Sequence, residues 1–237
     1  MIVSIDNRIP VPDSYAAVRT LGLYNVEPED AMRFRLDVDV PMERDDWQIG
    51  IIVGPSGSGK SSILRELATQ GWIEFQAGWD PGLPIIEPLS WESYAQATAS
   101  LSAVGLASVP SWLRPREVLS MGEGFRADMA QLLIAADDSD ERMMIDEFTS
   151  VLDRQVAKVA AGAFAKAWRK RPGRRLILFT PHYDILDWVQ PDWWIDTAEG
   201  ADQFAHDRGV IVARKGDFQE ARHHGGYRRN RVGSVEC

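Results

Sequence analysis

The chain has 237 residues, of which 45% are hydrophobic, and a formal net charge of −9, so it is long enough to bury one complete core and too acidic for a surface coated all over by nucleic acid. Its single cysteine, Cys237, excludes an intrachain disulfide and a cysteine-rich metal site. No apolar stretch approaches the roughly 18 residues of a membrane span and the first residues lack the pattern of a signal peptide, so we expect a soluble, cytoplasmic protein with no direct membrane insertion.

Apolar runs alternate with helical patterns along the chain, which predicts an α/β fold with a mostly parallel sheet flanked by helices. Expected strands occupy residues 32–38, 49–53, 72–75, 143–145, 176–179, 193–195 and 210–212. The clearest helix is expected over residues 153–170, where apolar side chains recur at three-and-four spacing, and a second over residues 121–136. We therefore expect one domain over residues 1–213, with a helical subdomain inserted at about residues 90–136, and a basic tail at residues 214–237.

A glycine-rich loop lies between the expected strand at residues 49–53 and an expected helix that starts near Ser61. It matches the pattern GxxxxGK(S/T) through Gly54, Pro55, Ser56, Gly57, Ser58, Gly59, Lys60 and Ser61, and Ser62 follows as a further phosphate contact. In such a loop, backbone N–H groups converge on phosphate oxygens, Lys60 reaches the outer phosphates and the Ser61 hydroxyl ligates Mg²⁺. The strand, loop and helix together favour a P-loop that binds ATP with Mg²⁺ over a glycine-rich turn without a ligand.

Two acidic residues follow the expected strand at residues 143–145. Asp146 is placed to help hold Mg²⁺, and Glu147 to orient or deprotonate the attacking water. Taken alone, an apolar strand that ends in Asp-Glu is a common strand terminus, but downstream of a P-loop the pair predicts hydrolysis. His182 follows the strand at residues 176–179 and is expected to face the γ-phosphate and stabilise charge in the transition state, although a lone histidine in this position is more often structural.

The segment Leu119-Ser120-Met121-Gly122-Glu123 precedes the acidic strand and resembles the signature motif (LSGGQ-like) of ABC ATPases. With the motifs above, it makes residues 49–195 similar to the nucleotide-binding domain of that family. The resemblance implies Lys60 and Ser61 on phosphates and metal, Asp146 on Mg²⁺, Glu147 as catalytic base, Asp153 in the D-loop and His182 as the switch histidine. It implies a P-loop NTPase fold and an ATPase that uses ATP and Mg²⁺.

In that family, two nucleotide-binding domains pack head to tail. The resemblance therefore implies that Ser120, Gly122 and Glu123 of one copy contact the γ-phosphate held by the P-loop of another, which predicts an ATP-dependent homodimer. From the residues alone, Ser120 is the N-cap of a helix and Glu123 its capping-box partner. Both interpretations can hold together.

Two positions of the family pattern are not assigned by this sequence. The family carries a glutamine between the P-loop and the signature, and no glutamine here lies in a convincing context; the candidates are Gln70, Gln76 and Gln96. An aromatic side chain that stacks on adenine is expected upstream of the P-loop. Tyr24 has about the right spacing, and the alternatives are Tyr15 and Phe34.

A narrower likeness comes from residues 102–106, 110–115, 182–185 and 190–193, which look like soluble bacterial and phage ABC-type ATPases, some of them fused to an acetyltransferase-like domain. This resemblance implies an ATP-driven conformational switch that acts on a nucleic acid or a separate protein partner. The tail from Arg214 to Arg231 carries six Lys or Arg residues against two acids. It is either a solvated polar tail or a contact for nucleic acid or an acidic partner.

Three other functions stay open. The first is the ATP-binding subunit of a membrane transporter, with a permease that binds beside residues 79–91. The second is a P-loop kinase, which needs an arginine-bearing lid and no signature motif; the candidate lid residues are Arg114, Arg116 and Arg126. The third is a nonhydrolysing binding module, against which the presence of both Glu147 and His182 argues.

Overall fold

The computed structural model describes residues 1–10, 13–27, 33–138, 142–198 and 211–214. Its centre is a five-stranded sheet with the order β4-β5-β6-β3-β7, in which every pair is parallel. The strands are β3 (Ile49–Val53), β4 (Ile73–Glu74), β5 (Met143–Ile145), β6 (Leu176–Thr180) and β7 (Trp193–Asp196). Every residue of β3, β5, β6 and β7 is buried, as expected for parallel strands covered on both faces. The predicted α/β fold is confirmed.

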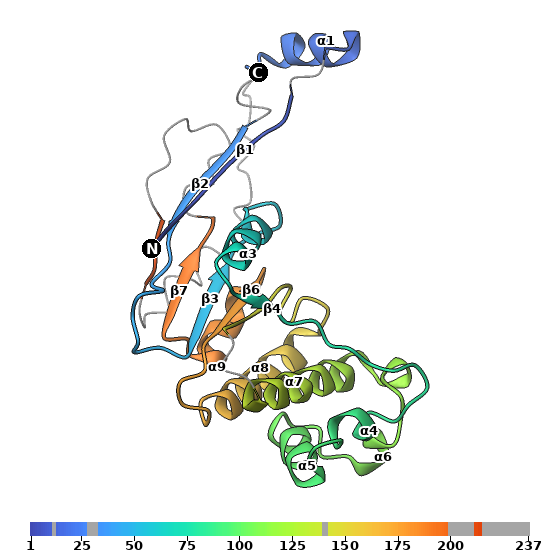
Figure 1. Ribbon diagram of the computed structural model, residues 1–237. Helices are drawn as coiled ribbons and strands as arrows, with labels where there is room; N and C mark the ends of the chain where they lie inside the picture. Colours follow the sequence, from blue (N-terminus) through green and yellow to red (C-terminus); the bar gives the residue numbers. More distant parts are fainter. Residues whose placement is uncertain (11–12, 28–32, 139–141, 199–210, 215–237) are drawn as a thin grey trace, which may run out of the picture.

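Alternate residues of the central strands join two separate hydrophobic clusters, one on each face of the sheet. Ile51 belongs to the cluster on the face covered by α7 (Met121–Asp138) and α8 (Arg154–Trp168). Ile52 belongs to the cluster on the other face, which α3 (Lys60–Thr69) covers. The helix after the P-loop and the helix after the signature motif therefore pack on opposite faces of the sheet (Figure 1).

A second, smaller sheet packs against α3. Its strands are β1 (Ile2–Arg8), β2 (Arg33–Asp39) and β8 (Ile211–Val212), in the order β1-β2-β8. The β1/β2 pair is antiparallel, and the β2/β8 pair is parallel. The sequence did not predict β1, because only Val3 and Ile5 of its residues are buried, which is too short an alternation to indicate a strand.

Helix α1 (Tyr15–Tyr24) connects the first two strands and was not predicted either. It begins at Ser14, whose hydroxyl accepts a hydrogen bond from the Ala17 amide at 3.3 Å. None of its residues is buried, and Figure 1 shows it projecting away from both sheets. Its apolar side chains, among them Tyr15, Val18 and Leu23, are exposed and belong to neither of the two hydrophobic clusters.

Between β4 and β5 the chain forms a group of helices. They are α4 (Ile86–Leu89), α5 (Tyr94–Ala103), α6 (Val109–Trp112), the 3-10 helix η1 (Arg116–Val118) and α7. Helix α5 packs against α7 and α8, so this group shares the hydrophobic cluster on one face of the sheet. The helices predicted at residues 121–136 and 153–170 are confirmed as α7 and α8, with ends shifted by no more than two residues.

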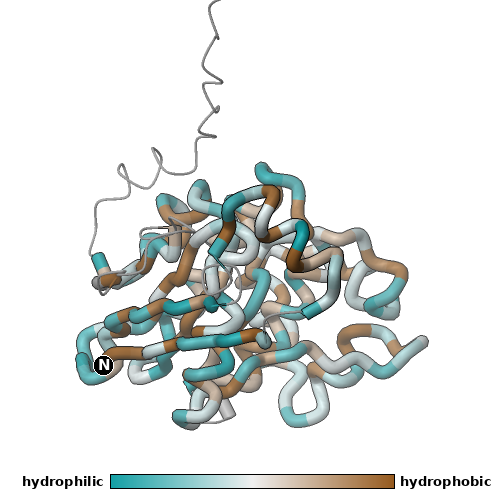
Figure 2. The backbone as a smooth tube through the Cα atoms, turned by 90° about the horizontal axis from the view of Figure 1, so that it is seen from above, coloured by the Kyte–Doolittle hydropathy of each residue, from teal (hydrophilic) through white to brown (hydrophobic). Residues whose placement is uncertain are grey.

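Two short helices follow β6, namely η2 (Tyr183–Ile185) and α9 (Leu186–Val189). In the parts of the chain that the structure describes, no helix combines the length and the apolar character needed to cross a bilayer. Figure 2 agrees, because short hydrophobic segments alternate with hydrophilic ones along the chain. The predicted basic tail at residues 214–237 lies outside the described residues, except for Arg214.

Candidate active site

The P-loop occupies residues 54–59 between the end of β3 and the start of α3. Its Gly57 and Gly59 have φ values of 78° and 98°, a region of backbone space that glycine enters readily. Gly59 is the N-cap of α3, and no side chain caps the helix there. The first backbone N–H groups of α3 are thus free of side-chain caps at a place where a helix N-terminus favours a phosphate.

The Lys60 side chain folds back over the P-loop. Its ammonium group donates hydrogen bonds to the carbonyl oxygens of Gly54 at 2.7 Å and Pro55 at 2.9 Å, and the residue is only 5% exposed. Burial lowers the pKa of Lys60 below its ordinary value, while the negative charges of Glu147 and Asp146 act in the opposite direction. The loop therefore holds a desolvated cation near the two acidic residues after β5.

Ser61 and Asp146, the two predicted metal ligands, meet in the structure. The Ser61 hydroxyl donates to Asp146 Oδ2 at 3.1 Å, and Asp146 Oδ1 accepts from the Glu147 amide at 2.8 Å. Hydroxyl and carboxylate oxygens at this separation suit Mg²⁺, which binds few protein ligands and keeps waters and substrate phosphates. Among the described residues no group of three or more His, Cys, Asp or Glu side chains is arranged around a metal site.

A tight turn after β5 presents the Glu147 carboxylate. Glu147 and Thr149 have φ values of 50° and 64°, in the left-handed region that costs a non-glycine residue roughly 1 kcal/mol or more. The Ser150 amide and hydroxyl both donate to the Glu147 carbonyl, at 3.0 and 2.7 Å. The result is an exposed carboxylate on a strained but hydrogen-bonded backbone at the end of a buried strand.

Thr180, which sequence analysis did not single out, joins this turn to the segment that carries His182. Its hydroxyl donates to the Phe148 carbonyl at 2.9 Å and accepts from the His182 amide at 3.2 Å. The Phe148 amide in turn donates to the Phe179 carbonyl at 2.8 Å. The structure thus brings Glu147 and His182 to the ends of two neighbouring strands, β5 and β6.

His182 is a half-buried imidazole between charged groups. Burial is the main cause that lowers the pKa of His182 below 6.5, and the positive charge of Arg154 lowers it further. Asp184, a hydrogen bond to the Ser150 backbone and Glu147 act in the opposite direction. The environment therefore favours the neutral imidazole.

Gln76, one of the three glutamines between which the sequence did not decide, lies at the same edge of the sheet as Asp146. Strand β4 pairs with β5 in the register Glu74 to Met144, and the ladder continues through a hydrogen bond from the Phe75 amide to the Met144 carbonyl at 2.8 Å. Gln76 is therefore level with Asp146, and it is exposed. The signal was present in the sequence, because Gln76 directly follows the strand predicted at residues 72–75. Neither Gln70, at the end of α3, nor Gln96, on α5, occupies such a position.

The signature motif forms the predicted capping box at the start of α7. The Glu123 carboxylate accepts from the Ser120 amide at 3.1 Å and from the Ser120 hydroxyl at 2.7 Å, and the Glu123 amide donates to the Ser120 hydroxyl at 3.3 Å. Ser111 also donates to this carboxylate at 2.7 Å, and its hydrogen bond is the main cause that lowers the pKa of Glu123. A Cβ at Gly122 would lie 3.0 Å from Val156 in the first turn of α8.

Asp153 is the N-cap of α8. Its side chain accepts hydrogen bonds from the amides of Gln155 at 2.9 Å and Val156 at 3.5 Å. The residue therefore has a structural role in the chain itself, and its contact with a nucleotide stays a prediction.

The three aromatic candidates for the adenine platform differ in position. Phe34 on β2 lies against the P-loop, where a Cβ on Gly59 would be 2.6 Å from its ring. Tyr15 and Tyr24 are highly exposed on α1, which Figure 1 shows far from α3. The structure therefore places Phe34, rather than the favoured Tyr24, next to the phosphate-binding loop.

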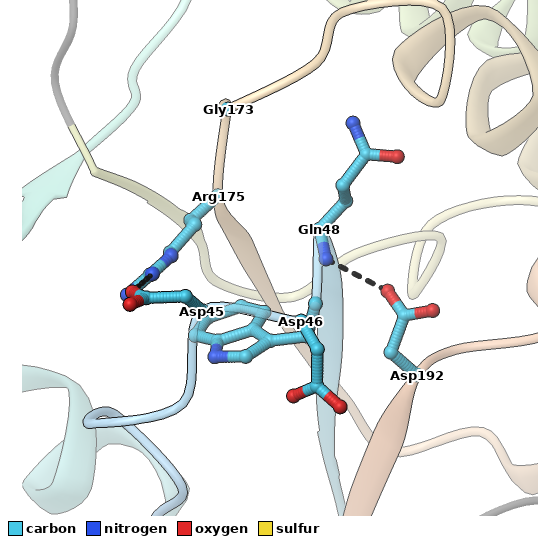
Figure 3. A pocket seen from close by; sticks show the side chains of 7 residues that line it. Asp45, Asp46, Gln48, Gly173, Arg175 and Asp192 are labelled. Atoms are coloured by element: carbon cyan, nitrogen blue, oxygen red, sulfur yellow. Dashed lines mark hydrogen bonds and ion pairs between the residues drawn. The ribbon is translucent and has the colours of Figure 1, made fainter.

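A small pocket of about 200 Å³ lies at the amino ends of the strands, away from the P-loop (Figure 3). In it, the Asp192 carboxylate accepts hydrogen bonds from the amides of Gln48 at 2.8 Å and Ile49 at 2.9 Å. Arg175 pairs with Asp45. These contacts fasten the starts of β3, β6 and β7, and we assign them to the fold rather than to nucleotide chemistry.

No protein-family model matches the chain, and no curated protein matches it. Solved structures do match. One is the ADP conformation of MJ1267, an ATP-binding cassette of an ABC transporter: the match covers 82% of this chain and 88% of that chain, with 15% identity and a TM-score of 0.53. Another is a dimeric post-hydrolysis state of the ATP-binding cassette MJ0796 bound to ADP and Pi: the match covers 83% and 94% of the two chains, with 15% identity and a TM-score of 0.51. The chain has the α/β P-loop fold of ABC ATP-binding cassettes.

Proposed function

We propose that this protein binds ATP with Mg²⁺ at the P-loop and hydrolyses it. The observation that carries the proposal is the contact between the Ser61 hydroxyl and the Asp146 carboxylate at 3.1 Å. This contact joins the phosphate-binding loop to the acidic end of β5. The side chains expected to bind the phosphates, the metal and the attacking water therefore lie close together. The cassettes with the same fold include one with ADP and one with ADP and Pi, which supports this assignment.

Each residue of the site has a separate task in this reaction. The P-loop amides and Lys60 bind the β- and γ-phosphates of the substrate. The oxygens of Ser61 and Asp146, with Gln76 beside them, would hold Mg²⁺, which neutralises developing phosphate charge when it is bound. Glu147 orients the attacking water and takes its proton.

His182 completes the set as a hydrogen-bond donor. The neutral imidazole carries one N–H, which suits donation to an oxygen of the γ-phosphate as charge develops there. A neutral donor also avoids an ion pair with Glu147, which must stay available to the water. The lowered pKa of His182 supports this role near neutral pH.

We further propose that a second copy of the chain completes each site. Ser120 and Gly122 would then contact the γ-phosphate held by the partner's P-loop, close to Asp153, while Glu123 holds Ser120 through the capping box. Helix α7 is long and begins with this motif, so its N-terminal backbone amides suit an anion. One of the cassettes that shares the fold is dimeric with ADP and Pi.

We consider two proposals for the partner on which the ATPase acts. A conformational switch on a nucleic acid or protein partner follows from the sequence likeness, whereas the solved cassettes of this fold include one from an ABC transporter, which supports the ATP-binding subunit of a transporter equally well. The alternative function as a kinase is less well supported, because two of its three candidate lid arginines make structural contacts. Arg116 donates to Asp128, and Arg126 donates to the Gly122 carbonyl.

The solution mass of Glu147→Gln tests the proposal. Removal of the base should slow hydrolysis and trap the ATP-bound dimer, so Mg·ATP is expected to double the mass measured by light scattering after size exclusion. ATP hydrolysis by the wild-type chain is measured in parallel. Glu92→Gln, at an exposed position between α4 and α5, is the matched control and should hydrolyse ATP like wild type.

A second variant distinguishes the composite site from unrelated association. Ser120→Arg in the Glu147→Gln background should stay monomeric with Mg·ATP, while Ser102→Arg, exposed on α5, should still dimerise. A wild-type chain that neither binds nor hydrolyses ATP would overturn the ATPase proposal. Hydrolysis by a chain that stays monomeric in every state would overturn only the composite site.

A further inference from the structure

Two neighbouring residues at the carboxyl end of β7 contact the two loops of the proposed active site. Asp196 and Thr197 are both 1% exposed. Asp196 Oδ1 accepts a hydrogen bond from the Tyr183 hydroxyl at 2.7 Å, and Thr197 Oγ1 lies 2.5 Å from Ser58 Oγ. Successive side chains of a strand point to opposite sides, so adjacent positions can reach two different loops.

The first contact, between Thr197 and Ser58 of the P-loop, requires a glycine at position 54. A Cβ on Gly54 would lie 2.0 Å from Thr197 Oγ1, so only glycine leaves room for this threonine. Thr197 Oγ1 also lies 3.2 Å from the Val53 carbonyl oxygen, and Ser58 Oγ 2.8 Å from the Pro55 carbonyl oxygen. Each hydroxyl has one proton, so one of them donates to the other and the second donates to its carbonyl. The Pro55 carbonyl is one of the two that hold the Lys60 ammonium. Thr197 thereby supports the backbone that positions this cation.

The second contact, between Asp196 and Tyr183, lies one residue from His182. Tyr183 follows His182 and begins the short helix η2. The carboxylate that binds its hydroxyl also accepts from the Ala198 amide at 2.8 Å, which fixes the orientation of Asp196. Within the described residues Asp196 Oδ2 has no hydrogen-bond partner, which makes this a costly carboxylate to bury for packing alone.

We propose that Asp196 and Thr197 are positioning residues of the ATPase, which set the separation between the P-loop and His182 from one point at the end of β7. This inference rests on the proposed function. Thr197 acts through Ser58 on the shape of the phosphate-binding loop, and hence on ATP binding. Asp196 acts through Tyr183 on the place of His182, and hence on the rate of hydrolysis.

The two arms are tested by variants that remove a single hydroxyl. Thr197→Val is expected to weaken ATP binding about tenfold, the effect of losing about one hydrogen bond, and Thr197→Ser to restore it. Tyr183→Phe is expected to leave the Kd for ATP unchanged and to lower kcat about tenfold, because a small displacement of a catalytic group is costly. The measurements are the Kd by titration calorimetry with Mg·ATP on the Glu147→Gln background, and kcat on the wild-type background.

Matched controls lie on α5, where Thr98 donates only within its own helix, to the Tyr94 carbonyl at 3.0 Å and the Ala95 carbonyl at 3.2 Å. Thr98→Val and Tyr94→Phe should behave like wild type, and the melting temperature of each variant reports general loss of structure. If wild type is active but both test variants keep their Kd and kcat, the positioning role is wrong. It is also wrong if both change the same parameter in proportion to a lower melting temperature. A wild type without ATPase activity overturns the proposed function, and this inference with it.

Discussion

Burial has the largest effect on the pKa of His182, and a small group of ionic neighbours modifies it. Arg154 forms a two-point contact with Asp184, and Lys158 reaches the same carboxylate at 3.4 Å. Burial lowers the pKa of His182 most, Arg154 lowers it further, and Asp184 raises it. The salt bridge therefore balances two opposing effects on the imidazole two residues away from Asp184.

Removing either partner of the salt bridge should shift the pKa of His182 in opposite directions. In Asp184→Asn the charge of Arg154 is no longer neutralised, so the pKa should fall further. In Arg154→Gln the repulsive charge is lost, so the pKa should rise. NMR titration of the imidazole, assigned by the signal that disappears in His182→Gln, measures both, and the wild-type midpoint should lie below 6.5.

The sign of the linked stability follows from the same shift. A folded-state pKa below the unfolded value means that protonation of His182 favours the unfolded chain. Its contribution to stability is therefore present above pH 6.5 and lost as the pH falls through the folded-state value. Equal shifts of the pKa in both variants, or a wild-type midpoint above 6.5, would contradict this account of the charges.

Helix α7 is fastened to the loop that follows Gln76. Gln131 accepts from the Gly78 amide at 2.9 Å and donates to the Gly78 carbonyl at 2.7 Å. Asp128 accepts from the Trp79 indole at 2.7 Å and from the Arg116 guanidinium at 2.9 and 2.7 Å. The helix that begins with the signature motif is thus joined to the loop after Gln76 by specific hydrogen bonds.

Asp128→Ala should destabilise the protein, because it leaves the Arg116 guanidinium and the Trp79 indole without their shared acceptor. Charge-assisted hydrogen bonds suggest a loss of about 1–3 kcal/mol in the free energy of unfolding, measured by the urea midpoint. Asp80→Ala, at an exposed aspartate in the same loop, should change it by no more than about 0.5 kcal/mol. Equal stability of the two variants would show that the Asp128 contacts contribute nothing.

The sequence predicted the elements that carry strong local patterns. Strands β3, β5 and β6 are short apolar runs buried on both faces, and α8 has a regular apolar stripe, so each appears close to its expected position. Helix α1 was not predicted, and none of its residues is buried. Distance along the chain favoured Tyr24 as the adenine platform, but α1 carries it away, and the strand pairing of β2 brings Phe34 to the P-loop instead.

Local patterns do not show which distant residues meet, so the polar contacts at the site were harder to predict than its motifs. Gln76 directly follows a predicted strand, but its position level with Asp146 follows only from the pairing of β4 with β5. Thr197 and Asp196 belong to no motif and contact residues more than ten positions away in the chain. Such contacts depend on tertiary packing, which a local pattern does not contain.

At the scale of the whole molecule, an exposed apolar surface supports the proposed association of two copies. The P-loop side and the signature side pack on opposite faces of the central sheet. Apolar side chains beside the signature and the D-loop are solvent-exposed in the single chain: Val118 and Met121 at 59%, and Val151 at 65%. A second copy that covered them would bury apolar surface next to the proposed contact between the signature motif and the γ-phosphate.

Hydrogen exchange should therefore report nucleotide binding at two places in the chain. With Mg·ATP, Glu147→Gln is expected to protect the amides of the P-loop and also those of residues 120–124, because the partner's nucleotide and surface cover the start of α7. The doubly substituted Glu147→Gln, Ser120→Arg chain should show protection at the P-loop alone, and Mg·ADP should leave residues 120–124 unprotected in both. Protection of residues 120–124 in a chain that stays monomeric would mean that the signature responds to its own nucleotide, and the composite site would have to be abandoned.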